Sequence, residues 1–373
     1  MKRHVLAPRS RWQEKVESVG LTYHSHENVP YWDESAAYEF DVWEIDALEQ
    51  AANTLHELYV AAAGTIIEKG WWDRLGVPEA AIPAIEASWE RDDFSLYGRF
   101  DVIYDGHSPA KLLEYNADTP TALVEAAVAQ WFWLEDCQPG MDQFNSIHER
   151  LIEAWKTLGN RRVHFCAVQD CPEDEQTVLY LQDTCQQAGL ETGRLAVEDI
   201  GWNTELRGFV DLQEAPIDTC FKLYPWEWMW REEFSKYLSV APTQFIEPSW
   251  KMLFSNKAML PILWELNAGH PNLLPAFESP EPLCGSYVQK PKLGREGANV
   301  TMVRQGETIA ATEGDYAGDG YVYQALAPSP DFDGNHPVLG LWIVNHEAAG
   351  LGIREDRSLV IGDSSRFVPH LFQ

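Results

Sequence analysis

One segment early in the chain, residues 98–120, restricts the fold more than any other. It reads GRFDVIYDGHSPAKLLEYNADTP, and polar residues alternate with apolar ones on both sides of the turn sequence DGHSP. Alternation of this kind around a turn that contains glycine and proline predicts a β-hairpin. Asp101 lies before the turn, and Glu114 and Asn116 lie after it. Because a buried carboxylate is costly unless a positive charge neutralises it, we expect this hairpin to meet a cation.

The alternation also predicts which of these side chains point the same way. Arg99 and Asp101 are expected on one face of the first strand, and Glu114 and Asn116 on one face of the second. Two carboxylates and an amide oxygen suit magnesium better than zinc, and an arginine beside them could stabilise a transferred phosphoryl group. The structural alternative is an ion pair followed by a turn that Asp118 caps. The residues alone leave both interpretations open.

A second candidate site begins near residue 290, directly after a predicted strand. The segment KPKLGREGANV places Lys290 and Arg295 around Gly294 and Gly297. Glycines let backbone N–H groups approach phosphate oxygens, and the basic side chains add positive charge. The segment is not a Walker A motif, and a basic β-turn remains the simpler explanation for it when it is taken alone.

Two further polar residues, Lys257 and Gln324, stand next to apolar runs. Lys257 opens an apolar stretch in SNKAM, and Gln324 ends a predicted strand in YVYQALAP. Each is more simply an ordinary lysine or a strand-end glutamine. The run WEWMW is likewise more simply part of the core, with Trp226, Trp228 and Trp230 packed inside. The sequence contains no H-x-x-x-H pair and no G-x-S-x-G elbow, which argues against a histidine metal centre and a serine nucleophile.

Hydrophobic spacing elsewhere predicts both helices and strands. Residues 33–90 read as helical with an end at Gly70, and two more amphipathic helices follow the hairpin, over 121–136 and 144–159. Further on, short strands surround one helix, which is typical of a small α/β unit. We expect residues 219–229 to form one of its strands.

From residue 248 the chain is expected to form one helix, over 248–266, and then an antiparallel sheet whose last strand covers 358–363. The predicted fold class is therefore α/β, or more strictly α+β. Three parts are expected: 1–160 with the N-terminal helices and the hairpin, 161–245 with the small α/β unit, and 246–373 with the later sheet.

The charge of the chain limits its partners. It carries 58 acidic and 28 basic residues, for a net charge of −30, which disfavours nucleic acids and anionic membranes and favours cations and polyamines. Its six cysteines show no C-x-x-C spacing, so free thiols in a reducing compartment are expected. No signal peptide and no apolar run long enough for a membrane span is visible, and we expect a cytoplasmic protein.

Taken in order, these segments resemble the synthetase part of the glutathionylspermidine synthase family, a group of ATP-grasp carbon–nitrogen ligases. The resemblance extends from about Trp12 to Phe372. It rests on GRFD, LEYNADTPT, KLYPWEW, SNKAMLPILWELNAGHPNLLPA, KPKLGREGANV, YVYQALAP and GLGIREDRSLVIGDSS. It implies an ATP-grasp fold in which 161–245 is a small inserted, pre-ATP-grasp-like substrate-binding subdomain. Residues 1–160 would contribute to the ATP-grasp core, and 246–373 would form the nucleotide-binding part.

The resemblance also implies roles for individual residues on the nucleotide side. Two magnesium ions would be held by Asp101, Glu114 and Asn116. Lys257 and Lys290 would contact the ATP phosphates, Asp101 would bind the nucleotide through magnesium, and the loop from Gly294 through Arg295 to Gly297 would close over the phosphates. Arg99 would in addition steady the γ-phosphoryl group during its transfer. The adenine hinge would consist of Gln324, Ala325 and Leu326.

On the substrate side, the resemblance implies that Arg295 and Arg354 hold the acid or the phosphate formed from it. Thr119, Thr121 and Glu227 match positions that contact the peptide and polyamine substrates in the family. Two departures concern this side: the turn reads ADTPT where a serine-type pattern is familiar, and GREGAN places Glu296 beside the phosphate site. ATP use is therefore better supported than glutathione and spermidine as the substrates.

The implied activity is ATP-dependent formation of an amide between a carboxylate or peptide and an amine, through an acyl phosphate and without a protein nucleophile. The amidase domain of the bifunctional members has no counterpart in these segments, so the synthetase part alone is expected. A non-catalytic nucleotide-binding protein, and a protein that only hydrolyses ATP or phosphorylates the acid, are the alternatives. The identity of the acid and the amine, and the oligomeric state, are left open.

Overall fold

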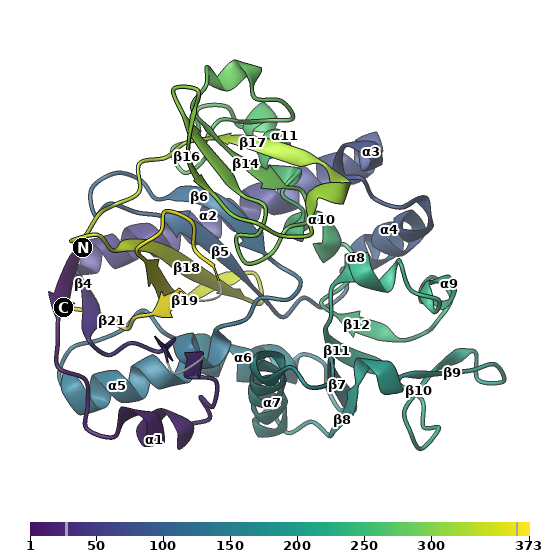
Figure 1. Ribbon diagram of the computed structural model, residues 1–373. Coiled ribbons are helices and arrows are strands. Elements are labelled where there is room, and N and C mark those ends of the chain that lie inside the picture. Colours follow the sequence, from purple (N-terminus) through teal and green to yellow (C-terminus); the bar gives the residue numbers. More distant parts are fainter. Residues whose placement is uncertain (27–28, 363–364) are drawn as a thin grey trace.

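The computed structural model describes residues 1–26, 29–362 and 365–373, and Figure 1 shows its sheets and the helices around them. The prediction of a mixed α/β class is confirmed. A central sheet of five antiparallel strands has the order β20-β19-β18-β5-β6. Its strands are β5 (Tyr97–Ile103), β6 (Lys111–Asn116), β18 (His336–Val344), β19 (Glu347–Asp356) and β20 (Arg366–Phe367). The long helix α2 (Val42–Lys69) packs against β18 and β19.

The hairpin predicted from residues 98–120 consists of β5 and β6. Its register pairs Arg99 with Asn116 and Asp101 with Glu114, so these polar side chains share one face as predicted. On the opposite face Phe100 stacks on Tyr115 within the core, with 3.7 Å between the ring centroids. The apolar face thus anchors the hairpin and leaves its polar face toward the second sheet.

The predicted helix over 33–90 is wrong at its start. Residues Ala36–Phe40 form strand β4, which pairs with β1 (Lys2–Val5) on one edge and β21 (His370–Phe372) on the other. In β4 (AAYEF) every residue except Glu39 is apolar and buried, so the segment lacks the alternation that identifies a half-buried strand. The helix begins at Val42 behind Asp41, whose capping box with Glu44 fixes the start.

A second sheet of five antiparallel strands lies above the central one in Figure 1. Its order is β13-β17-β14-β15-β16, with β13 (Ala276–Phe277), β14 (Tyr287–Pro291), β15 (Thr301–Arg304), β16 (Glu307–Ala311) and β17 (Tyr321–Ala325). The helix predicted over 248–266 is divided into α10 (Lys251–Ser255) and α11 (Met259–Leu266). Asn256 makes the break: its side-chain oxygen accepts the Ala258 N–H (2.9 Å), and its nitrogen donates to the Leu75 carbonyl (2.7 Å).

The small α/β unit contains a parallel sheet of order β12-β11-β7-β8. It consists of β7 (Val163–Ala167), β8 (Thr192–Ala196), β11 (Thr219–Leu223), β12 (Gln244–Ile246) and helix α7 (Pro172–Gln187), with the hairpin β9 (Gly201–Asn203) and β10 (Gly208–Val210) beside them. The strand predicted over 219–229 ends at Leu223, because Pro225 precedes the short helix α8 (Trp226–Met229). The three domain limits stay a prediction.

Further elements lie within the residues that the structure describes. They are α1 (Trp12–Glu17), β2 (Ser25–His26), β3 (Val29–Pro30), α3 (Trp72–Leu75), α4 (Ile82–Glu90), α5 (Gln130–Cys137), α6 (Ile147–Lys156) and α9 (Ser235–Leu238), four short 3-10 turns, and a π-helical segment over Glu125–Ala129. The strand predicted over 358–363 is wrong for residues 358–362, which form a loop, and residue 363 lies outside the described residues.

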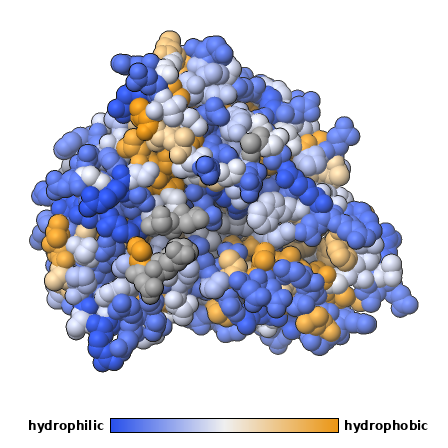
Figure 2. Space-filling view, viewed as in Figure 1, coloured by the Kyte–Doolittle hydropathy of each residue, from blue (hydrophilic) through white to orange (hydrophobic). Residues whose placement is uncertain are grey.

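Much of the face in Figure 2 is hydrophilic, in line with the acidic composition. Among the described residues, the structure contains no helix with the length and apolar character needed to cross a membrane.

Candidate active site

A cavity of about 260 Å³ lies where the central sheet, the second sheet and the parallel unit meet. It is lined by residues that the sequence singled out in widely separated segments. These are Arg99, Asp101, Glu114, Asn116, Thr119, Thr121, Lys257, Lys290, Gly294, Arg295, Gly297, Gln324, Ala325, Leu326 and Arg354. Glu227 lies one contact away, where it accepts a hydrogen bond from Arg295 (2.8 Å). The fold thus brings the predicted site residues together around one space.

The acidic side chains of the hairpin are paired with basic ones. Arg99 Nε donates to Asp101 Oδ1 (2.7 Å), and Arg354 lies 3.5 Å from Asp101 Oδ2. Lys257 Nζ lies 3.0 Å from Glu114 Oε2. The Asn116 amide joins the two halves, because its nitrogen lies 3.1 Å from Asp101 Oδ2 and 3.5 Å from Glu114 Oε1. The ion pair that was the alternative explanation for the hairpin is therefore present, and Arg99 acts as the counter-ion of Asp101.

The electrostatics of this cluster keep Glu114 charged. Burial alone would raise the pKa of the Glu114 carboxyl, but the charges of Lys257 and Lys290 outweigh burial and lower it to about 2. Burial lowers the pKa of Lys290 to about 8, and the Glu114 charge opposes that shift only in part. The Lys290 ammonium donates to the Gln324 side-chain oxygen (2.8 Å) and to the Leu113 carbonyl (2.9 Å). Glu114 is thus an anion, and Lys290 is held in place, at neutral pH.

The chemistry of these groups fits a magnesium–nucleotide ligand. Two carboxylates and an amide at one point form an oxygen-rich donor set, which Mg²⁺ prefers, especially when phosphate oxygens and water complete its shell. Within the described residues, no three His, Cys, Asp or Glu side chains come together as a metal site made by the protein alone. Magnesium would therefore be held jointly by Asp101, Glu114, Asn116 and the phosphates.

The other end of the cavity is apolar. Val288, Val300 and Val360 pack together there with Met302 and Leu326, and all five line the cavity. Apolar residues that line the same cavity as a cluster of cations suit a purine base joined to phosphates. Gln324 belongs to the predicted adenine hinge. Its side-chain oxygen accepts from Lys290, and its side-chain nitrogen donates to the Leu112 carbonyl (2.9 Å).

The backbone of the hinge is only partly available to a base. The Ala325 N–H donates to the Pro275 carbonyl (2.7 Å), and β17 has a neighbouring strand on each side. Leu326, which follows the strand, is therefore the hinge residue whose backbone is best placed to reach a ligand.

The glycine-rich loop between β14 and β15 covers the cavity and is fixed from two sides. Lys257 Nζ donates to the Gly294 carbonyl (2.6 Å), and the Lys257 N–H donates to the Lys292 carbonyl (2.8 Å). Gly297 has a φ of +68°, and a Cβ built on it would lie 2.3 Å from the Ile361 carbonyl oxygen. Only glycine combines this left-handed backbone with so close an approach. Val360 and Ile361 thus pack directly against the loop at Gly297.

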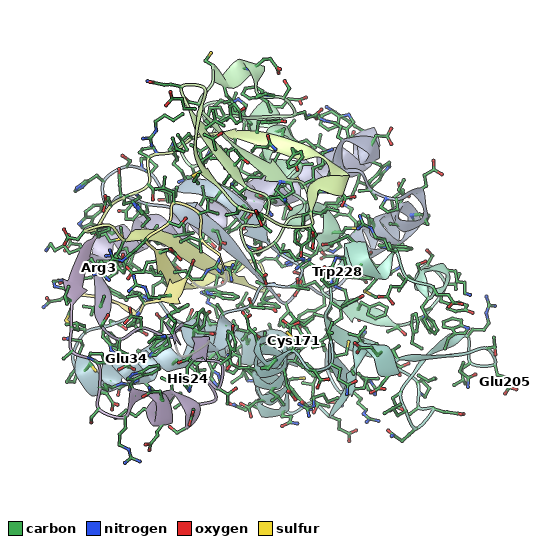
Figure 3. The ribbon with its side chains drawn as sticks, in the orientation of Figure 1. Arg3, His24, Glu34, Cys171, Glu205 and Trp228 are labelled. Atoms are coloured by element: carbon green, nitrogen blue, oxygen red, sulfur yellow. The ribbon has the colours of Figure 1, made fainter. Side chains whose placement is uncertain are left out.

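On the substrate side, Arg295 connects the loop to two other segments. Its Nη1 donates to Thr119 Oγ1 (2.6 Å), its Nη2 donates to Glu227 Oε1 (2.8 Å), and its guanidinium lies 5.5 Å from the Trp228 ring centroid. Trp228 was predicted in the core with its neighbours. It instead lines the cavity and is 36% exposed, near the middle of the face in Figure 3, whereas Trp226 and Trp230 are buried.

Asp174, which was not among the predicted site residues, also lines the cavity. It lies in the first turn of α7, after the carboxyl end of β7, and burial raises the pKa of its carboxyl to about 6, with the Glu173 charge adding to the shift. The signal was present in the sequence: PEDE follows an apolar strand, and ligand sites in parallel sheets lie beyond the carboxyl ends of the strands.

Comparisons with known proteins agree with this geometry. The family described as "Glutathionylspermidine synthase preATP-grasp" matches residues 3–373. The chain belongs to the glutathionylspermidine synthase family. The predicted resemblance, and with it an ATP-dependent ligase family of the ATP-grasp type, is thereby confirmed.

Individual relatives extend along most of the chain. A Haemophilus influenzae protein with the provisional name acid–amine ligase is 44% identical, over 96% of this chain and 96% of its own. The trypanothione synthetase of Crithidia fasciculata is 30% identical over 84% of this chain, which corresponds to 53% of the relative. The bifunctional glutathionylspermidine synthetase/amidase of Escherichia coli is 28% identical over 86% of this chain and 57% of its own length. The chain thus spans about half of these two longer synthetases.

A solved structure supports the fold. The glutathione synthetase-like effector of Globodera pallida superposes with a TM-score of 0.58 at 9% identity, and the match covers 97% of this chain and 96% of the effector. At that identity the likeness concerns the fold alone. The predicted ATP-grasp-related architecture is confirmed at that level.

Glu125, in the π-helical segment behind the site, carries a prediction about stability. Its side chain is fully buried, neither oxygen has a hydrogen-bond partner among the described residues, and burial raises its pKa to about 8. The folded state therefore holds a proton that the unfolded state releases near pH 4.5. That stabilisation is complete below pH 4.5 and is lost as the pH rises through 8, by up to roughly 5 kcal/mol.

We expect Glu125→Gln to remove this loss, so that the free energy of unfolding of the variant falls less between pH 5 and pH 9 than that of the wild type. Urea unfolding at pH 5, 7 and 9 measures the difference. Equal pH dependence in the two proteins would show that Glu125 is ionised in the folded state.

Proposed function

We propose that the protein is an ATP- and magnesium-dependent ligase that joins a carboxylic acid or peptide to an amine. The observation that carries this proposal is the meeting, in one cavity, of the acidic face of the hairpin with six lysine and arginine side chains. These are Arg99, Lys257, Lys290, Arg295, Arg304 and Arg354. Such a concentration of positive charge in an otherwise acidic protein suits a polyphosphate substrate.

The proposed reaction has two steps. A carboxylate oxygen of the acid attacks the γ-phosphorus of ATP, which releases ADP and gives an acyl phosphate; the amine nitrogen then attacks the acyl carbon, which releases phosphate and a proton. Magnesium, when bound, would neutralise phosphate charge. The chain's own contribution is positioning and electrostatic stabilisation. Arg99 would contact the transferred phosphoryl group, and Lys257 and Lys290 would contact the other phosphates.

The substrates would bind on the side of Arg295. Arg295 and Thr119 offer donors to the carboxylate of an acid, while Asp174 and Glu227 offer negative charge to an amine. The names of relatives support this class of substrate, since they include glutathionylspermidine and trypanothione synthetases. The net charge of −30 would also attract a cationic amine. We propose a small-molecule acid–amine pair and leave its identity to experiment.

A substrate panel tests the proposal. We expect purified protein with Mg²⁺ and ATP to release phosphate faster when a suitable acid and amine are both present, by at least roughly tenfold over ATP alone. The panel would combine glutathione and other short peptides with spermidine and simpler amines, and mass spectrometry would identify the amide. Phosphate release that depends on the acid alone would indicate an acid kinase. Absence of ATP binding in the presence of magnesium would contradict the proposal altogether.

A further inference from the structure

The turn after β6, residues 117–121, is held from several sides. The Tyr97 hydroxyl donates to the Pro120 carbonyl (3.0 Å), and Arg99 Nη1 donates to the Thr121 carbonyl (2.7 Å). The position of this turn therefore fixes the guanidinium that we expect to contact the transferred phosphoryl group.

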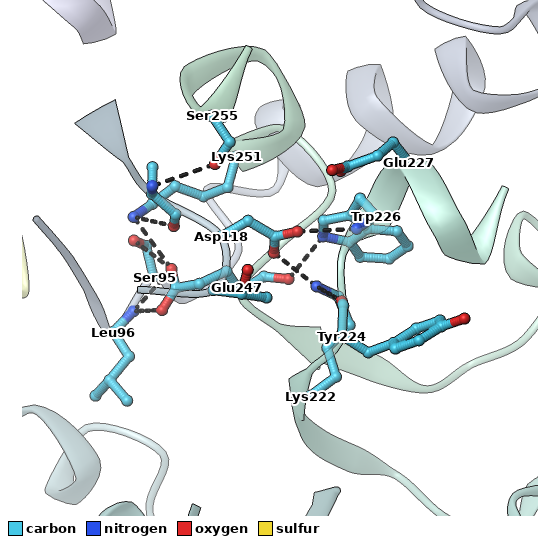
Figure 4. Close-up of polar contacts among 12 residues, drawn as sticks. Ser95, Leu96, Asp118, Lys222, Tyr224, Trp226, Glu227, Glu247, Lys251 and Ser255 are labelled. Atoms are coloured by element: carbon cyan, nitrogen blue, oxygen red, sulfur yellow. Dashed lines mark hydrogen bonds and ion pairs between the residues drawn. The ribbon is translucent and has the colours of Figure 1, made fainter. Parts of the chain in front are cut away.

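Asp118 is the buried centre of the turn (Figure 4). One of its oxygens accepts from Lys222 Nζ (2.6 Å), and both side chains are 1% exposed. The other oxygen accepts the N–H of Trp226 (2.8 Å), the first residue of α8. A carboxylate at a helix N-terminus stabilises the free N–H groups there. Asp118 thus ties β11 and α8 of the parallel unit to the end of the hairpin.

The contact to Trp226 closes a ring of interactions. Asp118 binds Trp226; the next residue, Glu227, binds Arg295; and Arg295 binds Thr119, which follows Asp118 in the chain. Three non-covalent contacts and two peptide links therefore connect the turn, α8 and the glycine-rich loop. A shift of α8 relative to the turn would move Glu227 away from Arg295 and free the Arg295 part of the loop from α8.

We propose that Asp118 is a positioning residue that fixes α8 and the glycine-rich loop relative to Arg99, so that an acid bound beside Arg295 lies next to the phosphoryl group bound beside Arg99. The inference rests on the proposed function for its chemical part. Its structural part concerns contacts within the chain alone. The two parts can therefore be tested separately.

The structure offers a matched control for this test. Glu247 is a second fully buried carboxylate in the same region; it lies 3.2 Å from Lys251 Nζ and accepts from the N–H of Leu96 and Tyr97. Figure 4 shows it on the opposite side of Asp118 from Glu227. Asp118→Asn and Glu247→Gln each replace a buried carboxylate by an amide of the same shape. Only the first change disturbs the ring, because the Lys222 ammonium and the Trp226 N–H then compete for a single amide oxygen.

The first measurement is hydrogen exchange without nucleotide. We expect exchange in peptides covering residues 292–299 to be about tenfold faster in Asp118→Asn than in the wild type, and unchanged in Glu247→Gln. Because Asp118→Asn also leaves the Lys222 ammonium buried without a carboxylate, the double variant Asp118→Asn with Lys222→Met guards against simple misfolding. Its amide oxygen can still accept the Trp226 N–H, so slow exchange should return. Equal exchange in Asp118→Asn and Glu247→Gln would overturn the proposal, as would fast exchange in a folded double variant.

The second measurement uses Mg²⁺, ATP, glutathione and spermidine as probes. We expect Asp118→Asn to release roughly tenfold or more phosphate per amide formed than the wild type, because a misplaced acid attacks the γ-phosphorus less often and leaves ATP to hydrolysis by water, while the KM for ATP stays within about threefold. A role in folding alone would change neither quantity in the folded fraction, and an unchanged ratio would contradict the chemical part. A wild type that makes no amide would count against the proposed substrates, and the exchange result would still decide the structural part.

Discussion

Replacing Glu114 and Asn116 together by alanine is expected to lower ATP turnover by about 10³-fold or more, because removal of the donors that hold the metal removes charge neutralisation from the transferred group. Both side chains line the cavity, and each contacts the cluster around Asp101 through a single polar group, so the apolar face of the hairpin is untouched. Phosphate release at saturating magnesium and ATP measures the effect. The fold should survive, as judged by circular dichroism and cooperative thermal unfolding.

Two controls separate chemistry from stability in this experiment. Glu114→Gln keeps the shape of the side chain but removes the charge that Lys257 contacts, and should show most of the loss. Asp105→Ala weakens the hairpin at its turn, where the carboxylate accepts the N–H groups of His107 (2.9 Å) and Ser108 (2.7 Å), yet leaves every cavity donor in place. It should lower stability more than turnover. Wild-type turnover in the double alanine variant would rule out the metal assignment.

Local pattern was enough to predict the parts of the site that lie within one hairpin. Alternation placed Arg99, Asp101, Glu114 and Asn116 on one polar face, because side chains on a strand point to opposite sides in turn. The same reasoning failed at β4, which is buried on both faces and therefore lacks alternation. The hydrophobic pattern of a sequence shows which residues are buried and which are exposed. A strand that is buried on both faces and a buried helix both appear as apolar runs, so the pattern does not distinguish them.

Pairing between distant segments could not be predicted in this way. The contact between Lys257 and Glu114 and that between Arg295 and Glu227 join segments far apart in the chain, and they arise only after the sheets have packed. Family resemblance indicated that these residues share a site, but it gave no indication that lysine and carboxylate neutralise each other there. Trp228 was misplaced for a related reason: its exposure depends on the loop that carries Arg295, and nothing local to WEWMW reports that loop.

Arg99→Lys is expected to lower kcat by about 10²- to 10³-fold while the affinity for ATP changes little, since loss of one preorganised donor at the transferred group has an effect of that size. Arg99 uses three nitrogens at once: Nε and Nη2 donate to Asp101 (2.7 and 3.2 Å), and Nη1 donates to the Thr121 carbonyl (2.7 Å). Lysine keeps the charge but cannot reproduce this planar fork. Single-turnover phosphate release, together with equilibrium ATP binding, separates the two effects.

A glycine behind Arg99 gives an independent way to test its position. A Cβ built on Gly340 would lie 2.8 Å from Arg99 Cδ, whereas one built on Gly352, its partner across β18 and β19, would meet Phe367 (3.0 Å) and Ala126 (3.4 Å) instead. Gly340→Ala should therefore lower kcat in the same direction as Arg99→Lys, and Gly352→Ala should mainly lower stability. Arg99→Lys and Gly340→Ala both act on the Arg99 guanidinium. The loss of kcat in the double variant should therefore be far smaller than the sum of the two single losses. Additive losses, or equal losses in the two glycine variants, would mean that the placement of Arg99 does not limit the reaction.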